Sequence, residues 1–327
     1  MIIAVDLGTS NTTIYVKGVG VVLSEPTMAV VHCGKKTEIR FTGNSAKKMI
    51  GKTTGSSVLY SPVEDGIVVK PDVASLMLKD YFSRIVDGSI IKHRIRAVVS
   101  VNCGASLAER KMLENVFLNA GVSDVVIVDS PLALKQVVPE NNAFFVDIGG
   151  GTTEVSAVSK IGIIHAYSLN IGGNTIDDAI VNLLSERFML KIGKVTAEKI
   201  KLSIGSLYEN DISTVTVSGR NIINGAPISI ELNASDIRPL IKSHIDKILE
   251  VVAAVINLVP PEMAGDMAGK GIYLAGGCSK LAGLSEYVSG ALKLNVEILE
   301  QNSLINGLSF LASDRNRLNE ALNMENL

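Results

Sequence analysis

The residues with the clearest chemical meaning follow an apolar run in the middle of the chain. Residues 144–146 are apolar and lead into Asp147, after which the segment continues with Gly149, Gly150, Gly151, Thr152 and Thr153. Glycines at the end of a strand let backbone N–H groups converge on an anion such as a phosphate oxygen. Threonine hydroxyls add donors, and the Asp147 carboxylate is suited to hold a hydrated magnesium ion beside the phosphates. The pattern therefore predicts a phosphate-binding turn between two strands, although an ordinary hairpin turn also needs glycine.

A second copy of this pattern lies near the N-terminus. After the apolar residues 2–5, the chain reads Asp6-Leu7-Gly8-Thr9-Ser10-Asn11-Thr12-Thr13. Both stretches contain aspartate, leucine or isoleucine, glycine, three small or polar residues and then threonine. Two such hairpins in one chain predict a duplicated domain, in which two phosphate-binding turns face one nucleotide across a cleft.

Length and composition limit the classes of protein that fit. A chain of 327 residues suggests about two domains. Apolar residues make up 47% and charged residues 20%, so the chain can bury a large core and is not disordered. A net charge of −2 gives no overall basic surface for nucleic acid. Cys33, Cys103 and Cys278 lack metal-ligand spacing and are odd in number, which is typical of a reducing cytosol.

The chain shows no segment that predicts export or membrane insertion. A strand begins at Ile2 and a functional turn follows at once, so we expect no signal peptide. The longest apolar helix, around residues 248–259, is interrupted by Glu250 and is too short to span a bilayer. We therefore predict a soluble, cytoplasmic protein.

Strands and helices alternate along the chain, which indicates an α/β fold. A helix over residues 196–202 carries Glu198 and Lys201 on neighbouring faces at a three-residue step. We predict strands at 2–5, 13–17, 19–23, 28–32, 39–42, 96–101, 125–128, 164–169, 215–217, 228–232 and 272–275, and helices at 43–53, 72–86, 106–120, 131–138, 175–189, 196–202 and 235–258.

These motifs resemble those of the MreB-type bacterial actins, in the superfamily of actin, DnaK-type chaperones and sugar kinases. The resemblance is nearly end to end. The turns at Asp6 and Asp147 are similar to the two phosphate loops of the family. Further similar stretches are Thr196-Ala-Glu-Lys-Ile-Lys, Val217-Ser-Gly-Arg, Pro260-Pro-Glu and Gly271-Ile-Tyr-Leu-Ala-Gly-Gly. The first two of these point to MreB rather than to chaperones or kinases.

The resemblance implies an actin-like fold: two duplicated α/β domains, or four subdomains, around a nucleotide cleft with ATP and Mg²⁺. Domain I would span residues 1–140, with a small outer subdomain at about 29–65, and residues 305–327 would pack back onto it. Domain II would span residues 141–304, with a small outer subdomain at about 174–230.

The resemblance also assigns the residues of the site. Asp6 and Asp147 would hold the metal ion, and Glu198 and Lys201 would meet the sugar or base of adenosine. Without the resemblance, Glu198 and Lys201 would be interpreted as a solvated helical pair. Catalytic roles would fall to Asp147, Thr152 and the position of Ser130. The phosphates would be met by Gly8, Thr9, Ser10, Asn11, Thr12, Gly149, Gly150 and Gly151, and the adenine by Gly276 and Gly277.

Ser130 is a departure from the family pattern. MreB-type proteins have a glutamate directly before a proline at this point, where it orients the attacking water, and here Ser130 precedes Pro131. A serine hydroxyl can hydrogen-bond a water but cannot act as a base near neutral pH. Asp129 is one residue away, and alternation along a strand would point it elsewhere. Because phosphoryl transfer depends mostly on positioning and charge, we predict ATP binding with weak hydrolysis, that is, a weak ATPase.

Cys278 is a second departure, because the family has a third glycine after Gly276 and Gly277. A small thiol is tolerated beside adenine, and the sequence leaves open in which direction it changes nucleotide affinity.

A possible membrane contact lies in the segment around Ile90 and Ile91, which is followed by Lys92 and Arg94. Two isoleucines beside basic residues suit insertion at an anionic membrane surface. Packing of both isoleucines under the following strand fits the sequence equally well, and the two alternatives stay open.

The predicted function is that of an ATP-binding, filament-forming cytoskeletal protein for cell shape or spatial organisation. Its partners would be other copies of itself, cell-shape proteins and the inner face of the cell membrane, with no nucleic acid. The alternatives are a non-filamentous actin-fold ATPase and a small-molecule kinase. A kinase would need a catalytic aspartate and a sugar pocket near the second loop, and a chaperone would need a further peptide-binding domain; neither is visible.

Overall fold

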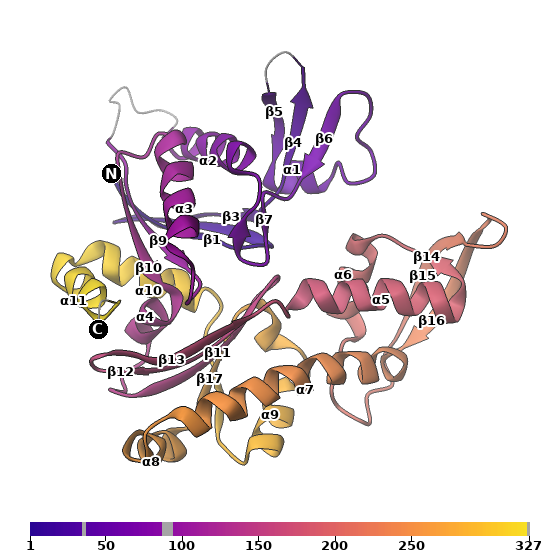
Figure 1. Cartoon of the computed structure of the whole chain (residues 1–327). Helices are drawn as coiled ribbons and strands as arrows, with labels where there is room; N and C mark the ends of the chain where they lie inside the picture. The colour runs from indigo at the N-terminus through magenta and orange to yellow at the C-terminus, as the bar shows by residue number, and fades with distance from the viewer. Residues whose placement is uncertain (35–36, 87–93, 326–327) are drawn as a thin grey trace. The chain divides into compact units, whose positions relative to one another are not determined.

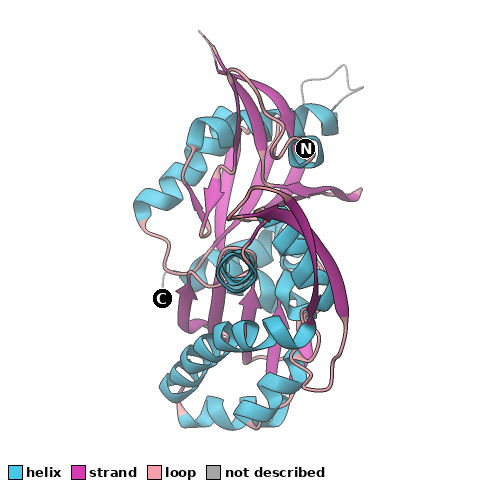
Figure 2. Cartoon of the chain, turned by 90° about the vertical axis from the view of Figure 1, so that its right-hand side faces the viewer, coloured by secondary structure: helices cyan, strands magenta, loops and turns pink. Residues whose placement is uncertain are grey.

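The computed structural model describes residues 1–34, 37–86 and 94–325 (Figure 1). The chain divides into two units. The first comprises Met1–Ala143, Val158–Ser168 and Asn302–Leu327, and the second comprises Phe144–Ala157 and Leu169–Gln301. Both units combine helices with strands, which Figure 2 distinguishes by colour.

The first unit is built on a five-stranded sheet in the order β10-β9-β1-β2-β3. The central strand β1 pairs parallel with β9 and antiparallel with β2, and β9 pairs parallel with β10. Most positions of β1 and β9 are buried, as expected for strands covered on both faces. The strands are β1 (Ile2–Leu7), β2 (Asn11–Val16), β3 (Gly20–Pro26), β9 (Arg96–Val101) and β10 (Asp124–Asp129).

A second five-stranded sheet has the order β13-β12-β11-β17-β18. Strand β17 pairs parallel with both β11 and β18. Each sheet thus has three consecutive strands, with two later parallel strands added beside the first of them. This repeated order agrees with the duplication predicted from the two glycine turns. The strands are β11 (Ala143–Ile148), β12 (Thr153–Ser159), β13 (Gly162–Leu169), β17 (Ile272–Ala275) and β18 (Val296–Ile298).

Helices cover the sheet of the first unit. Residues Ile3 and Val5 of β1 belong to a buried cluster with Tyr81 and Phe117, which come from α2 and α3. Helix α10 packs against β1, β2, β9 and α4. The remaining elements of this unit are a three-stranded sheet of β4 (Ala29–Cys33), β5 (Thr37–Thr42) and β6 (Ser57–Tyr60), the short hairpin of β7 (Val63–Glu64) and β8 (Ile67–Val68), and helices α1 (Gly43–Lys47), α2 (Pro71–Val86), α3 (Leu107–Asn119), α4 (Ser130–Leu134), α10 (Ser303–Ser313) and α11 (Arg315–Glu325).

The helix predicted at residues 43–53 is wrong in its length. Helix α1 ends at Lys47, and the chain then turns through Gly51, whose φ of +73° is left-handed.

The second unit contains the longest helix, α7, at whose start the Asp236 carboxylate accepts a hydrogen bond from the Asn233 N–H at 3.0 Å. Its buried side chains recur every three or four residues, so one apolar stripe faces the interior. No helix in the described ranges combines the length and the apolar character that a membrane crossing requires. The other elements are helices α5 (Gly173–Phe188), α6 (Lys194–Ile204), α7 (Ala234–Leu258), α8 (Pro261–Lys270) and α9 (Leu284–Leu292), and a small sheet of β14 (Leu190–Lys191), β15 (Thr214–Asn221) and β16 (Pro227–Asn233).

Candidate functional site

The first glycine turn joins β1 to β2 and closes on itself. The Gly8 N–H donates to the Asn11 carbonyl at 3.1 Å, and a Cβ on Gly8 would lie only 2.9 Å from that oxygen. Thr9 accepts a hydrogen bond from the Gly66 N–H at 2.9 Å, which ties the turn to the hairpin of β7 and β8. Asn11 is exposed and Ser10 is half-buried, so both lie at the surface of this unit.

A buried threonine outside the motif, Thr27, stabilises this turn by hydrogen bonds. The Thr27 hydroxyl donates to the Gly8 carbonyl at 2.7 Å and lies 2.9 Å from the Thr12 hydroxyl. Because the Thr27 hydrogen is used on Gly8, the Thr12 hydroxyl is the donor between the two threonines. Both side chains are fully buried. The hydroxyl of Thr12 therefore stabilises the turn from within the sheet.

Asp6 stands at the end of β1, directly before this turn. Its carboxylate accepts a hydrogen bond from the Ser100 hydroxyl at 3.2 Å. Burial raises the pKa of Asp6 to about 6, and the Ser100 hydrogen bond opposes part of that rise. A half-buried carboxylate with a raised pKa fits a cation site, because a bound cation would favour its charged form.

The residue in the position of the expected glutamate, Ser130, directly follows β10 and begins α4. Ser130 is 3% exposed, and its hydroxyl donates to the Val101 carbonyl at 3.0 Å. The preceding Asp129 forms an ion pair with Arg110 of α3. Burial raises the pKa of Asp129, and Arg110 opposes this rise. Arg110 is a partner that the sequence pattern did not reveal, because it lies 19 positions before Asp129.

The second glycine turn, between β11 and β12, repeats the geometry of the first. The Gly149 N–H donates to the Thr152 carbonyl at 2.8 Å, the same three-residue step as Gly8 to Asn11. A Cβ on Gly149 would lie 3.2 Å from that carbonyl oxygen. Thr153 is fully buried and donates to the Ile171 carbonyl at 2.6 Å, while Thr152 is only half-buried. The motif therefore encodes the same closed turn twice.

The beginning of α5 is bonded to this second turn. The N–H groups of Gly173 and Asn174 donate to the carbonyls of Gly149 and Gly150. Both bonds use N–H groups that the first turn of a helix leaves unpaired. The positive end of the α5 dipole thus lies beside the turn, as in sites that bind phosphate.

Lys201 and Glu198 extend from α6 toward α5. The Lys201 side chain is 10% exposed, forms an ion pair with Asp177 and bonds to the Gly173 carbonyl. Glu198 is half-buried. Burial raises the pKa of Asp177, and the bonded Lys201 opposes this rise. Lys201 is therefore not the solvated residue that the helical pattern alone indicated.

The strand β17 ends beside the second turn. Gly276 has a φ of +81°, and a Cβ there would collide with the Ile148 carbonyl and the Asp147 carboxylate, so only glycine fits. Gly277 has open space around its Cβ position. The Cys278 thiol lies 3.5 Å from the Gly149 carbonyl. The second unit thus brings Asp147, the glycine turn, Lys201 and the Gly276 segment together.

Cys278 and Cys33 are expected to differ in reactivity. Cys33 is exposed, whereas burial raises the pKa of the Cys278 thiol. Because the thiolate is the nucleophile, a maleimide at about pH 7.5 should modify Cys33 at least about tenfold faster. Peptide mass spectrometry after timed quenching measures both rates, and a Cys33→Ser variant controls for assignment. Equal rates would contradict the enclosed position of Cys278.

The metal site would need ligands from outside the protein. Across the described residues, no three or more His, Cys, Asp and Glu side chains gather closely enough to hold a metal ion. Asp6 lies in the first unit and Asp147 in the second, and each offers carboxylate oxygens, the type of ligand that Mg²⁺ takes together with phosphate oxygens and water.

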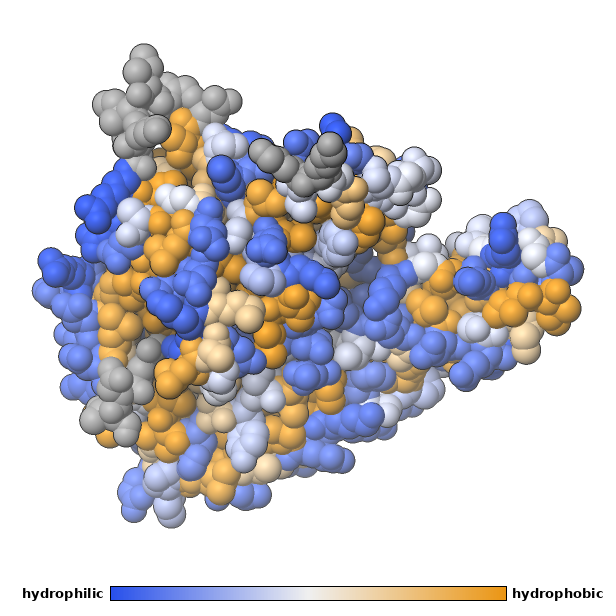
Figure 3. Space-filling model, turned by 45° about the horizontal axis from the view of Figure 1, so that its top comes forward, coloured by the Kyte–Doolittle hydropathy of each residue, from blue (hydrophilic) through white to orange (hydrophobic). Residues whose placement is uncertain are grey.

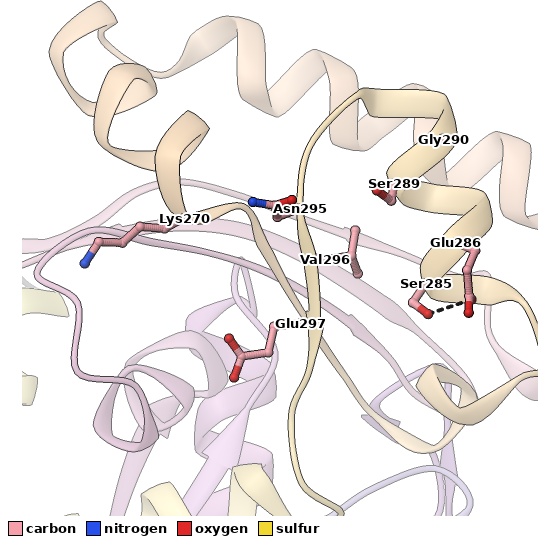
Figure 4. A pocket seen from close by; sticks show the side chains of 8 residues that line it. All are labelled: Lys270, Ser285, Glu286, Ser289, Gly290, Asn295, Val296 and Glu297. Atoms are coloured by element: carbon pink, nitrogen blue, oxygen red, sulfur yellow. Dashed lines mark hydrogen bonds between the residues drawn. The ribbon is translucent and has the colours of Figure 1, made fainter.

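A separate polar pocket of about 760 Å³ lies elsewhere in the second unit (Figure 4). It contains none of the predicted site residues. A hydrogen bond joins Ser285 to Glu286 on its α9 side. Its lining residues are Lys270, Ser285, Glu286, Ser289, Gly290, Asn295, Val296 and Glu297.

Comparison with known protein families shows to which family the chain belongs. A sequence profile of the MreB/Mbl protein family matches residues 1–320. The chain belongs to the MreB/Mbl family. This family member is 33% identical over 307 residues to the cell shape-determining protein MreB of Escherichia coli (strain K12), covering 91% of this chain and 88% of that protein.

Solved structures of related proteins agree with this membership. MreB5 of Spiroplasma citri bound to ADP is 29% identical, with 97% of each chain covered and a TM-score of 0.89. The MamK double helical filament is 20% identical, covers 96% of this chain and 98% of its own, and has a TM-score of 0.81, which shows the shared fold. The actin-like α/β fold and the resemblance to MreB-type bacterial actins are therefore confirmed.

Proposed function

We propose that this MreB/Mbl family member binds ATP with Mg²⁺ and assembles with copies of itself into cytoskeletal filaments for cell shape or spatial organisation. The observation that carries the proposal is the pair of glycine turns closed by the same hydrogen bond, in each of which the glycine follows two residues after an aspartate near the end of a central strand. The nucleotide in the related MreB5 structure supports the same use of the fold.

In this proposal, different residues would bind the phosphates, the magnesium ion and the adenosine. Backbone N–H groups of both turns would face phosphate oxygens, because closure by the glycine bond leaves the intervening N–H groups outside that bond. Asp6 and Asp147 would hold Mg²⁺, which supplies charge neutralisation at the phosphates when bound. Gly277, with open space at its Cβ position, would lie against the adenine, and Glu198 would meet the sugar or base.

The proposed hydrolysis is weak, because Ser130 cannot orient and activate water as a carboxylate does. Asp147 and the half-buried Thr152 stay as the catalytic candidates of the second turn. The Ser130 hydroxyl donates its hydrogen to Val101, so it would meet a water only as an acceptor.

A Ser130→Glu variant is expected to hydrolyse ATP faster by about tenfold or more, since a positioned carboxylate contributes at least that factor. Phosphate release at saturating ATP measures the change. Ser130→Ala, which removes the bond to Val101 without adding a carboxylate, should keep the slow rate of the unmodified protein. Turnover of Ser130→Glu no faster than that of Ser130→Ala would refute this explanation.

Self-association would use surface positions that family membership alone does not specify. Apolar and polar residues are interspersed on the face shown in Figure 3. Among the residues that the structure describes, five large apolar side chains are more than 70% exposed: Val19, Leu107, Leu202, Ile212 and Ile223. The proposed cytoplasmic placement, with peripheral membrane contact and cell-shape proteins as partners, would involve Ile90 and Ile91, which lie outside the described residues.

The test is sedimentation with phosphate release on the purified chain, using ATP, ADP and a non-hydrolysable analogue with Mg²⁺. Polymer with ATP and the analogue, together with slow phosphate release, supports the proposal. If the protein binds ATP but does not sediment as polymer with any of the nucleotides, the alternative of a non-filamentous ATPase is favoured. Transfer of phosphate to a sugar acceptor would identify a small-molecule kinase instead.

A further inference from the structure

The Lys201 ammonium is held by two groups of the neighbouring helix α5. Its Nζ donates to the Gly173 carbonyl at 2.7 Å and lies 2.9 Å from Asp177 Oδ1. The Lys201 and Asp177 side chains are only 10% and 7% exposed. A buried ammonium is stable only when it is paired and hydrogen-bonded, so these contacts fix α6 against the first turn of α5.

A third residue, Cys278, lies near the same part of α5. A Cβ on Gly173 would lie 2.9 Å from Lys201 Nζ and 3.0 Å from the Cys278 thiol. The ammonium and the Cys278 thiol thus both lie close to Gly173, and Asp177 Oδ1 lies 2.9 Å from Nζ. This position is that of a packed structural cation rather than of a side chain extended toward solvent.

The first turn of α5 also holds the second glycine turn. The N–H groups of Gly173 and Asn174 donate to the Gly149 and Gly150 carbonyls at 3.0 and 2.7 Å. A Cβ on Gly172 would lie 2.8 and 2.7 Å from the same two oxygens, so helix and turn are in close contact. A displacement of this end of α5 would therefore displace the turn.

The carbonyls held by α5 determine where the N–H groups of the turn point. Each peptide unit is planar, so fixing the Gly149 carbonyl also fixes the Gly150 N–H, which points the opposite way. The Gly150 carbonyl fixes the Gly151 N–H in the same manner. These two N–H groups are among the proposed phosphate donors.

We infer that Lys201 acts on the phosphate end of the nucleotide through this turn, and that Asp177 is the positioning residue that holds Lys201. The inference rests on the proposed nucleotide binding. If Lys201 acts through the turn, its replacement should weaken the binding of ATP and ADP but not of adenosine. If Lys201 instead touched the sugar or base, its replacement should weaken the binding of all three. The inference also adds Asp177, which lies outside the sequence motifs.

The experiment compares ligands that carry phosphates with one that carries only the sugar and base. Lys201→Met and Asp177→Asn are compared with the unmodified protein for binding of Mg-ATP, ADP and adenosine, the last by saturation-transfer NMR. We expect the affinity for ATP and ADP to fall by about tenfold or more in both variants, because each leaves a buried charge unpaired and loosens the turn. The affinity for adenosine should change less than about twofold, since no phosphate is present.

A matched control exists on the same two helices. Lys194 of α6 pairs with Asp178 of α5 at 2.7 Å, but both side chains are exposed, at 73% and 48%. Lys194→Met should leave all three affinities unchanged. If a single variant does not fold, a Lys201→Met, Asp177→Leu double variant removes both charges together and keeps the volume filled. It should fold, bind adenosine normally and still bind ATP weakly.

Each result is informative. An equal loss of adenosine and ATP affinity in Lys201→Met would overturn the inference and restore a direct contact with the sugar or base. Unchanged ATP affinity in folded Asp177→Asn would also overturn it. Failure of the unmodified protein to bind ATP or ADP at all would instead refute the proposed function.

Discussion

Asp6→Asn is expected to make the nucleotide-free protein more stable while abolishing its binding of Mg-ATP. Burial raises the pKa of Asp6 to about 6, from an ordinary 3.8. The folded state therefore binds more protons than the unfolded state between these two values. The free energy of unfolding consequently falls as the pH rises through this window, and the whole loss is present above about pH 6. A neutral asparagine avoids this cost and cannot serve as an anionic magnesium ligand.

The expected gain in unfolding free energy of Asp6→Asn follows from the raised pKa of Asp6. A rise of about two pKa units corresponds to about 3 kcal/mol, which we reduce to about 2 kcal/mol for the partial exposure of the site. Urea unfolding without nucleotide should show this gain for Asp6→Asn at about pH 7.5, and most of it should vanish at about pH 4.

Ser100→Ala is the matched control for Asp6, because it removes the hydrogen bond that lowers the pKa of Asp6 but keeps the carboxylate. It should destabilise the nucleotide-free protein at neutral pH and retain binding of Mg-ATP. A stability of Asp6→Asn equal to that of the unmodified protein at both pH values would show that the carboxylate is not buried as described.

Gly276→Ala is expected to destabilise the protein by about 2 to 4 kcal/mol and to abolish nucleotide binding. The alanine would have to adopt a φ of +81°, and its Cβ would collide with the Ile148 carbonyl and the Asp147 carboxylate. Relief of that collision moves Asp147, the proposed magnesium ligand of the second turn. Thermal unfolding and nucleotide titration measure the two effects.

Gly277→Ala provides the comparison for Gly276→Ala, because the next glycine along the chain has nothing within 4 Å of its Cβ position. It should unfold within about 1 kcal/mol of the unmodified protein, the ordinary range for a surface substitution. Similar losses of stability in the two variants would mean that the close approach at Gly276 does not limit the fold.

The parts of the site that could be predicted from the sequence are those encoded locally. Each glycine turn is specified by about eight consecutive residues, so the motif alone is sufficient to predict a turn between two strands. The helix α2 was also predicted within a residue at its start, because its apolar period is regular over 16 residues.

The parts that could not be predicted depend on partners distant in the chain. Thr27 fastens the turn at Gly8 from 19 positions away, and Lys201 bonds to Gly173 across 28 positions. Strand β6 has four residues and no strong alternation, and it exists because it pairs with β4. Local patterns carry no record of such pairings, since the contacts form only after the elements pack together.

The identical closure of the two turns bears on the evolutionary history of the gene. The bond from Gly8 to Asn11 and the bond from Gly149 to Thr152 preserve one backbone path in both halves. The side chains between them have meanwhile drifted apart, to threonine and serine in the first copy and to two glycines in the second. The two halves thus share one main-chain path at this turn and differ in its side chains, which is the pattern that an internal duplication would leave if only the path of the backbone were under a common constraint.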